Sequence, residues 1–231
     1  MAARTADVAR GLEVVRGRIE QACAAAGRRA DDITLIGITK TYPAADARVL
    51  LDLGVTDLGE NRANEARDKA AEVPDARWHF VGQLQTNKAR VVARFAAAVH
   101  SVDREALVAA LDRAVANAER PPLPVFLQVS LDGAVRRGGV TAENLGALAD
   151  GVAAARNLRL AGVMAVAPQG QEPGQAFARL QAISVDLVGR YPQAGAISAG
   201  MSDDLEAAIA HGATHVRVGS ALLGRRPPDV G

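Results

Sequence analysis

The stretch ITLIGITK, residues 33–40, decides between two α/β folds. It is a short apolar run that ends in Thr39 and Lys40, and parallel strands covered by helices on both faces are apolar in this way. An open, doubly wound sheet normally carries a glycine-rich loop directly after its first strand. No such loop follows residue 40, so the stretch favours a closed barrel of parallel strands.

The same kind of apolar run recurs along the rest of the chain. Seven more runs occupy residues 57–59, 78–82, 97–102, 125–129, 160–166, 196–199 and 215–219. Amphipathic stretches that predict helices lie between them, at residues 44–53, 62–73, 88–95, 104–118, 142–155, 174–190 and 203–210. Eight strands that alternate with helices, joined by right-handed crossovers, predict a single (β/α)8 TIM barrel, for which about 200–250 residues suffice.

The region before the first strand predicts one additional helix. Apolar residues recur at helical spacing within residues 5–26, as in Val8, Leu12 and Val15, and Gly27 stands where a helix would end. Neither an internal repeat nor a linker interrupts the chain. We therefore expect one domain over residues 1–231.

Composition narrows the classes of function. The 231 residues include 27 Lys and Arg against 26 Asp and Glu, a formal net charge of +1, so no overall field would attract nucleic acid or an acidic membrane. A single cysteine, Cys23, excludes an internal disulfide, and no His, Cys or carboxylate group has the spacing of a metal site. The N-terminus lacks a signal-peptide pattern and no run of about 18 apolar residues occurs, which predicts a cytoplasmic protein without membrane or nucleic-acid partners.

In a barrel of this kind, chemistry takes place at the carboxyl ends of the strands. Lys40 ends the first strand and shares a face with Ile36 and Ile38. One interpretation is a lysine that reaches out to solvent. The other is an amine at the mouth of an apolar barrel, where desolvation favours the neutral nucleophile that forms a Schiff base with an aldehyde.

The last strand, HVRVG at residues 215–219, carries a charged residue at an interior position. Val216 and Val218 share the face that packs against outer helices, so Arg217 points into the barrel. A buried guanidinium requires a partner. It either pairs with a carboxylate such as Glu60 or faces a bound ligand.

Two loops with small residues follow the last two strands. GMSDD, residues 200–204, leaves the seventh strand, and GSA, residues 219–221, leaves the eighth. TIM barrels often bind phosphate with these two loops, and small residues let backbone N–H groups approach an anion. Together the loops predict a phosphate site, and the alternative role for Ser202 is that of an ordinary helix N-cap.

Further polar residues stand near strand ends. Asn61, which follows the second strand, could offer its amide to a ligand. His79 in the third strand is more often a satisfied core histidine than a catalytic base, and His100 and His211 look incidental. The turn RRGG, residues 136–139, is either a solvated loop or a second anion contact.

Taken together, these sequence motifs resemble those of the pyridoxal phosphate homeostasis protein family. The matching motifs are ITKT (38–41), GEN (59–61), WHFVG (78–82) with QTNK (85–88), GMSDD (200–204) and RVGSALLG (217–224). The resemblance implies a barrel like the N-terminal domain of alanine racemase, with the cofactor pyridoxal 5'-phosphate (PLP) at its mouth. It implies a Schiff base on Lys40, Asn61 beside the cofactor and Arg217 opposite the pyridine nitrogen. It also implies that the residues around the phosphate are Gly200, Met201, Ser202, Gly219 and Ser220.

Two positions depart from the family pattern. Ser220 stands where threonine is frequent, a change that keeps the hydroxyl group. The RRGG turn at residues 136–139 stands where a Lys-x-Gly turn is expected, so the resemblance assigns no ligand role to it.

The resemblance and the residues together favour a binding protein over an enzyme. Racemisation needs acid/base groups on both faces of the substrate carbon, and alanine racemases supply the second from a tyrosine in another domain of the partner subunit. The chain has two tyrosines, Tyr42 and Tyr191, and nothing in the sequence places either of them at that second face. A cationic Arg217 also disfavours protonation of the pyridine nitrogen, which weakens PLP as an electron sink.

We therefore expect a monomeric protein of PLP homeostasis that binds, buffers and delivers PLP to apo-enzymes, without substantial turnover. His79 and Tyr42 are kept as residues near the site. Two alternatives stay open. One is an amino-acid racemase that uses Tyr42 or water as its second base, and the other is a PLP-free barrel enzyme that acts on a sugar phosphate.

Overall fold

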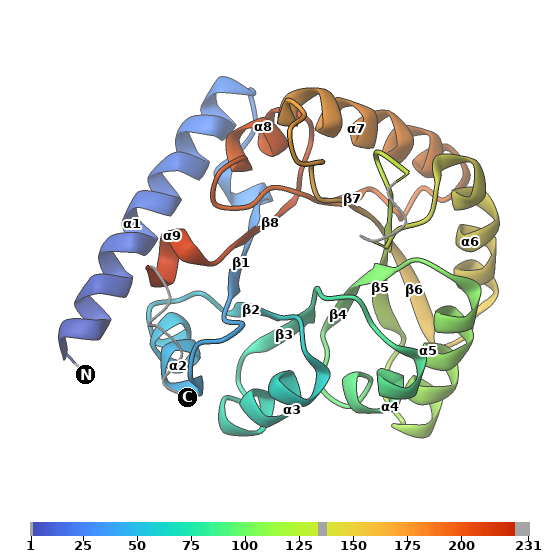
Figure 1. Ribbon diagram of the computed structural model, residues 1–231, viewed down its shortest axis with the longest axis horizontal. Coiled ribbons are helices and arrows are strands. Elements are labelled where there is room, and N and C mark those ends of the chain that lie inside the picture. Colours follow the sequence, from blue (N-terminus) through green and yellow to red (C-terminus); the bar gives the residue numbers. More distant parts are fainter. Residues whose placement is uncertain (1, 134–137, 225–231) are drawn as a thin grey trace.

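A closed barrel of eight parallel strands forms the centre of the molecule (Figure 1). The computed structural model describes residues 2–133 and 138–224. Neighbouring strands follow one another in chain order, and the last strand pairs with the first. The strands are β1 (Thr34–Ile38), β2 (Asp57–Glu60), β3 (Arg77–Phe80), β4 (Ala98–Val102), β5 (Leu123–Gln128), β6 (Leu158–Met164), β7 (Ala196–Ser198) and β8 (His215–Val218). The predicted (β/α)8 TIM barrel is confirmed.

Helices surround the barrel and connect successive strands (Figure 1). They are α1 (Ala2–Ala25), α2 (Ala44–Asp52), α3 (Ala63–Glu72), α4 (Ala89–Val92), α5 (Glu105–Asn117), α6 (Ala142–Ala154), α7 (Pro173–Arg190), α8 (Leu205–Ala210) and α9 (Ser220–Leu223), with the 3-10 turns η1 (Ala30–Asp32) and η2 (Thr86–Lys88). In α5, the buried residues Leu107, Leu111 and Ala114 recur every three or four positions. This spacing places one apolar face of the helix against the strands.

The expected N-terminal helix is present and covers the last part of the chain. The blue helix α1 runs beside α9 and α8 in Figure 1. Val8, Leu12 and Val15 are buried at helical spacing, as the sequence predicts, and Gly27 follows the helix with a φ of 65°. Burial of this apolar face holds α1 against α8 and α9, the helices that follow β7 and β8.

Two predicted helices are shorter than expected. Within residues 88–95, Lys88 ends η2 and only Ala89–Val92 form the single turn α4, after which Arg94 and Phe95 bond only to carbonyls three residues back. The helix predicted at 203–210 begins at Leu205, because the side chain of Asp204 accepts the backbone N–H of Met201 and closes a turn ahead of the helix. The alternative role of Ser202 as an N-cap is therefore wrong.

Strand β5 begins two residues before the predicted start and includes Pro124. The N–H of Leu123 donates to the carbonyl of Asn157 at 2.9 Å, so pairing with β6 begins there. Successive N–H groups of a strand point to opposite sides, and pairing with β4 begins only at Val125. The missing N–H of Pro124 therefore breaks no ladder bond.

The core between strands and helices consists mainly of Ala, Val and Leu. Among the described residues, the largest fully buried aromatic side chains are Trp78, Phe80 and Phe177. Val216 and Val218 are fully buried and pack within the cluster that includes Leu12 of α1, so Arg217 between them points to the barrel interior as predicted. Over residues 2–133 and 138–224, no helix has the length and apolar character required to cross a bilayer.

Candidate functional site

A cavity of about 680 Å³ lies at the carboxyl ends of the strands. Its lining residues are Ile38, Lys40, Tyr42, Asn61, Val81, Gly82, Met164, Val166, Met201, Ser202, Asp203, Arg217, Gly219, Ser220 and Gly224. Most of the candidate residues that are distant in the sequence thus meet in one place. Gly200 and His79 are not among the lining residues.

Lys40 lies half-buried in the turn after β1 and lines this cavity. Within the described residues, Lys40 Nζ makes no hydrogen bond or ion pair. The next residue, Thr41, has a φ of 69°, a left-handed conformation that non-glycine residues adopt only at a cost. The turn must therefore be held by its surroundings.

A buried ionic network holds both sides of this turn. Lys69 Nζ donates to the carbonyl of Thr39 at 2.7 Å, to Glu60 Oε1 at 2.6 Å and to Glu65 Oε1 at 2.8 Å. Glu60 Oε1 also accepts the hydroxyl of Thr39, and Glu65 Oε1 accepts the N–H of Thr41. Residues 39 and 41 are thus fixed by the same lysine–glutamate cluster, and Lys40 is presented between them.

The two glutamates respond differently to burial. Desolvation raises the pKa of the Glu60 carboxyl, despite its hydrogen bonds from Lys69 and Thr39. For Glu65, desolvation also acts to raise the pKa, but hydrogen bonds from Lys69 and Thr41 outweigh it and the pKa is lowered. Nothing in the sequence distinguishes Lys69 from the other charged residues of its amphipathic stretch at 62–73.

Asn61 follows β2 and brings an unpartnered amide to the cavity. Its Oδ1 atom is buried and has no hydrogen-bond partner among the described residues. A buried polar atom without a partner is unfavourable and is rare in folded proteins. Asn61 therefore adds to the cavity lining an amide whose oxygen is not satisfied by the described residues.

The two loops after β7 and β8 bring their hydroxyl groups together. Ser220 Oγ donates to Ser202 Oγ at 3.1 Å, and the N–H of Ala221 points to the same oxygen at 3.4 Å. A Cβ atom at Gly219 would lie 3.2 Å from the carbonyl oxygen of Ile38, so a larger residue would press on β1. Gly200 is buried behind the cavity with a φ of 91°, and its carbonyl accepts the N–H of Arg217.

The loop after β7 is attached to helix α1. Arg18 donates to the carbonyl of Ser202 at 2.8 Å and forms a two-bond ion pair with Glu206 at 2.6 and 2.8 Å. The additional N-terminal helix thus supports the hydroxyl pair from outside the barrel.

Arg217 is buried and is one of the residues that line the cavity. Its Nη1 donates to Ser198 Oγ at 2.6 Å and its Nη2 to the carbonyl of Ala165 at 2.9 Å. Burial lowers its pKa to about 10. The alternative of an ion pair with Glu60 is wrong, because Glu60 binds Lys69 instead.

His79 lies below the cavity, in the barrel interior. Its ring bonds to Asp57 at 2.8 Å and to His100 at 2.9 Å, so it is a satisfied core histidine. His100, which the sequence analysis set aside as incidental, is fully buried and stacks on Phe126 with ring centres 4.1 Å apart. The sequence feature that could have identified His100 as an interior residue is its place within the apolar run at 97–102.

Neither tyrosine has a free hydroxyl. Tyr42 lines the cavity, but its hydroxyl donates to the carbonyl of Gly224 at 2.7 Å. Tyr191 follows α7, and its hydroxyl donates to Asp150 at the protein surface. Arg136 and Arg137 of the RRGG turn lie outside the described residues.

The apolar wall of the cavity was not predicted from the sequence. Val81, Met164 and Val166 contribute to it, and Val166 is unusually exposed for a valine, at 42%. These residues occupy strand ends, where apolar side chains are ordinary, so no sequence signal marks them.

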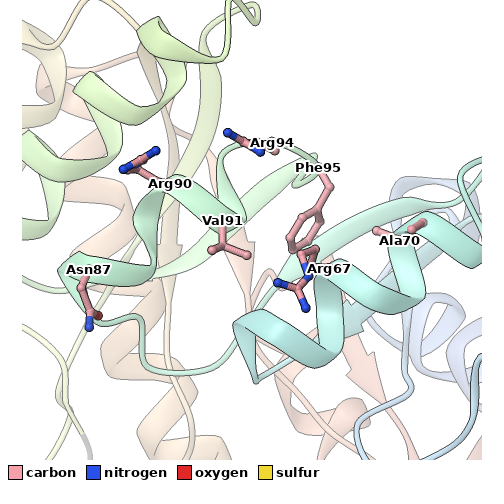
Figure 2. A pocket seen from close by; sticks show the side chains of 8 residues that line it. Arg67, Ala70, Asn87, Arg90, Val91, Arg94 and Phe95 are labelled. Atoms are coloured by element: carbon pink, nitrogen blue, oxygen red, sulfur yellow. The ribbon is translucent and has the colours of Figure 1, made fainter.

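A second cavity, of about 530 Å³, lies on the outer surface between α3 and α4 (Figure 2). It is lined by Arg67, Ala70, Ala71, Asn87, Arg90, Val91, Arg94 and Phe95. These residues come from outer helices and their connections, and none is a candidate from the sequence. The site at the barrel mouth therefore stands as the candidate functional site.

Fold and site together define a class of (β/α)8 barrels with a lysine and a pair of serine hydroxyls at the mouth. The family model described as "Alanine racemase, N-terminal domain" matches residues 14–227. The pyridoxal phosphate homeostasis protein of Mycobacterium leprae is 43% identical over 241 residues, which cover 96% of this chain and 93% of that protein. The chain belongs to the pyridoxal phosphate homeostasis protein family, as its motifs indicated.

Solved structures agree with this assignment. PipY of Synechococcus elongatus, solved with PLP bound, is 32% identical with a TM-score of 0.82 and covers 94% of this chain and 100% of that one. Alanine racemase of Corynebacterium glutamicum has a TM-score of 0.67 at 15% identity, covering 98% of this chain and 62% of that one. The likeness to the racemase is one of fold alone.

Proposed function

We propose that this protein binds PLP in the cavity at the barrel mouth and acts as a carrier that buffers and delivers it. Its relatives are named for PLP homeostasis, and PipY is solved with PLP bound. The observation that carries the proposal is the content of this one cavity. It combines the unpartnered amine of Lys40, a pair of serine hydroxyls and the unpartnered buried amide oxygen of Asn61.

These groups suit the chemical parts of PLP. The hydroxyls of Ser202 and Ser220 can donate to a phosphate, and the small residue Gly219 lines the same cavity. Asn61 and Arg217 line the same cavity and would serve the polar edges of a pyridine ring. When PLP is bound, its aldehyde supplies an electrophilic carbon. Lys40 Nζ would form a C=N bond (a Schiff base) with that carbon while the aldehyde oxygen leaves as water, and hydrolysis would reverse the linkage.

Two features support a carrier rather than an enzyme. Arg217 presents a cation where a carboxylate would otherwise stabilise a protonated pyridine nitrogen, so electron withdrawal by the ring is weaker. Racemisation also needs a second acid/base group, and the hydroxyl of Tyr42 is engaged with the carbonyl of Gly224.

The decisive experiment locates the covalent bond and measures turnover on the same preparation. Protein incubated with PLP is reduced with borohydride and mapped by peptide mass spectrometry. We expect the pyridoxyl label on Lys40, its loss in Lys40→Ala, and its retention in the control Lys88→Ala, whose lysine lies outside the mouth cavity.

The same protein is then incubated with L-alanine and other amino acids. We expect no sustained racemisation or transamination. A label on a different lysine would overturn the proposed site, and rapid turnover that depends on Lys40 would overturn the carrier function.

One observation favours the alternative of an amino-acid racemase: Tyr42 lines the same cavity as Lys40. If Tyr42 were the second base, Tyr42→Phe would abolish turnover while leaving PLP bound. If Tyr42→Phe leaves a low rate of turnover unchanged, the result contradicts a role of Tyr42 as second base.

The proposal extends to assembly and delivery. We propose that the barrel works as a single PLP-binding unit and as a monomer, and that apo-enzymes which require PLP are the recipients. Light scattering of the loaded protein tests the first statement. Transfer of PLP to a purified apo-enzyme, followed by recovery of that enzyme's activity, tests the second.

A further inference from the structure

A chain of hydrogen bonds crosses the interior of the barrel and ends at the cavity. His79 links Asp57 Oδ1, 2.8 Å from its Nε2, to His100 Nε2, 2.9 Å from its Nδ1. His100 Nδ1 lies 2.8 Å from Ser198 Oγ, which accepts the Nη1–H of Arg217 at 2.6 Å. We call these residues the interior chain: Asp57, His79, His100, Ser198 and Arg217.

The interior chain joins the two ends of the barrel. Asp57 is the first residue of β2 and lies at the amino end, whereas Arg217 lines the cavity at the carboxyl end. The members come from five strands, and His100 and Ser198 are fully buried. Because water does not reach these atoms, the polar groups must satisfy one another.

The chemistry of the two ends sets the direction of the hydrogen bonds there. A guanidinium only donates, so Ser198 Oγ accepts from Arg217 and its own hydrogen is free for His100 Nδ1. At the other end, desolvation acts to raise the pKa of Asp57, but hydrogen bonds from His79 and Thr56 outweigh it and the pKa is lowered. An ionised carboxylate only accepts, so His79 carries its hydrogen on Nε2.

The direction in the middle of the chain depends on the hydrogens of the two rings. When each ring carries one hydrogen, His79 Nδ1 accepts from His100 Nε2–H, and His100 Nδ1 accepts from Ser198. Burial lowers the pKa of His100 well below its ordinary value, which keeps that ring neutral. In that state all hydrogens point from Arg217 toward Asp57.

This direction matters because Arg217 has no ion pair among the residues that the structure describes. Aligned hydrogen bonds polarise one another in a low-dielectric interior, so the chain connects the buried cation to a remote carboxylate. It also fixes one edge of the guanidinium on Ser198, while Ala165 fixes the other. We propose that the interior chain positions Arg217 from the opposite end of the barrel and makes Asp57 a positioning residue for the ligand cavity.

The first test concerns the protein without ligand and is independent of the proposed function. Protein labelled with 15N-histidine is studied by NMR at pH 7, with resonances assigned by single His→Gln variants. We expect His79 and His100 each to carry one hydrogen, on Nε2. A hydrogen on Nδ1 of His100 would overturn the proposal.

The second test removes the terminal carboxylate. In Asp57→Leu, His79 Nε2–H loses its acceptor, so the hydrogen is expected to move to Nδ1 and the tautomer of His100 to reverse with it. Ser198 then accepts from both neighbours and holds Arg217 less firmly. We expect the dissociation constant for PLP, which rests on the proposed function, to rise about 3- to 30-fold, the range typical of coupled distant sites.

The matched control is Asp112→Leu, in α5. Asp112 accepts the backbone and side-chain N–H groups of Asn157 and touches neither the interior chain nor the cavity. We expect the histidine tautomers and PLP retention of this variant to match those of the unmodified chain. Equal losses of PLP in both leucine variants would overturn the proposal, because they would report general destabilisation.

The proposal can be tested even if the Asp57→Leu variant does not fold. If Asp57→Leu fails to fold, Ser198→Ala cuts the same chain beside Arg217 and should weaken PLP retention within the same range. Unchanged PLP retention in a folded chain-cutting variant would overturn the positioning role. Failure of the unmodified protein to bind PLP would instead overturn the proposed function and leave the tautomer result standing.

Discussion

At the scale of single residues, Ser202 and Arg217 differ in what their loss would remove. Ser202 contacts Ser220 and the N–H of Ala221 at a half-buried position, whereas the guanidinium of Arg217 satisfies two buried acceptors. From the sequence, either substitution would weaken PLP binding more than folding. In the structure this expectation holds only for Ser202, because loss of Arg217 would also leave buried acceptors without a donor.

We therefore predict that Ser202→Ala raises the dissociation constant for PLP about tenfold or more, since a hydrogen bond to a charged group contributes about 1.5–3 kcal/mol. Its free energy of unfolding should change by less than about 1 kcal/mol. Equilibrium dialysis and urea denaturation measure the two quantities. Arg217→Met is the comparison and should lose both. A Ser202→Ala protein that unfolds easily but retains PLP would contradict the prediction.

Lys69 is the residue on which the Lys40 turn depends. Its removal leaves the Glu60 carboxyl, which is fully buried, without its cationic partner. We predict that Lys69→Met lowers the free energy of unfolding by about 3–5 kcal/mol at pH 7. The control Lys88→Met, which loses only a 3.5 Å contact with Asn64, should change it by less than about 0.5 kcal/mol. Denaturation curves that coincide for the two variants would show that the network does not stabilise the fold.

At the scale of elements, helix α1 contains a matched pair of glycines. A Cβ atom at Gly11 would lie 2.7 Å from the carbonyl oxygen of Leu222 and 2.8 Å from that of Ala221, both in α9. At Gly17, within the same helix, a Cβ atom would meet nothing within 4 Å. Alanine has a higher helix propensity than glycine at both positions, so only the contact with α9 separates them.

We predict that Gly17→Ala stabilises the protein by about 0.5–1 kcal/mol and that Gly11→Ala destabilises it by about 1–3 kcal/mol. Because α9 begins at Ser220, Gly11→Ala should also weaken PLP retention. Thermal unfolding with and without PLP measures both effects. Equal stabilisation by the two alanines would mean that α1 does not press against α9.

At the scale of the whole molecule, the buried histidines make stability depend on pH. Burial lowers the pKa of His215 from 6.5 to about 4, with a further contribution from His79, and it lowers that of His100 as well. The unfolded chain therefore takes up protons first as the pH falls. Stability from these rings is complete above pH 6.5 and is lost toward the lower folded-state value.

We predict that the free energy of unfolding falls between pH 7 and pH 5, with about 2 kcal/mol of the loss due to His215. Urea denaturation at several pH values in this range measures it, above the pH at which most carboxylates titrate. His215→Gln should reduce the slope. A flat profile from pH 7 to pH 5 would contradict the prediction.

What the sequence by itself determined was the fold and the rim of the site. Period-two and helical spacing identify strands and helices one at a time, and parallel βα units in series leave every βα loop at one end of the barrel. Lys40, Asn61, Ser202 and Ser220 follow four different strands, so the fold class alone brings them to one cavity.

Only the tertiary structure decided how these residues are held. Arg217 meets Ser198 rather than Glu60, and Glu60 meets Lys69. His100 finds partners 21 and 98 positions away, in His79 and Ser198. Local patterns predict which side of a strand a residue occupies. They do not predict its partner across the interior, because side-chain reach and strand register together select that partner only when the barrel closes.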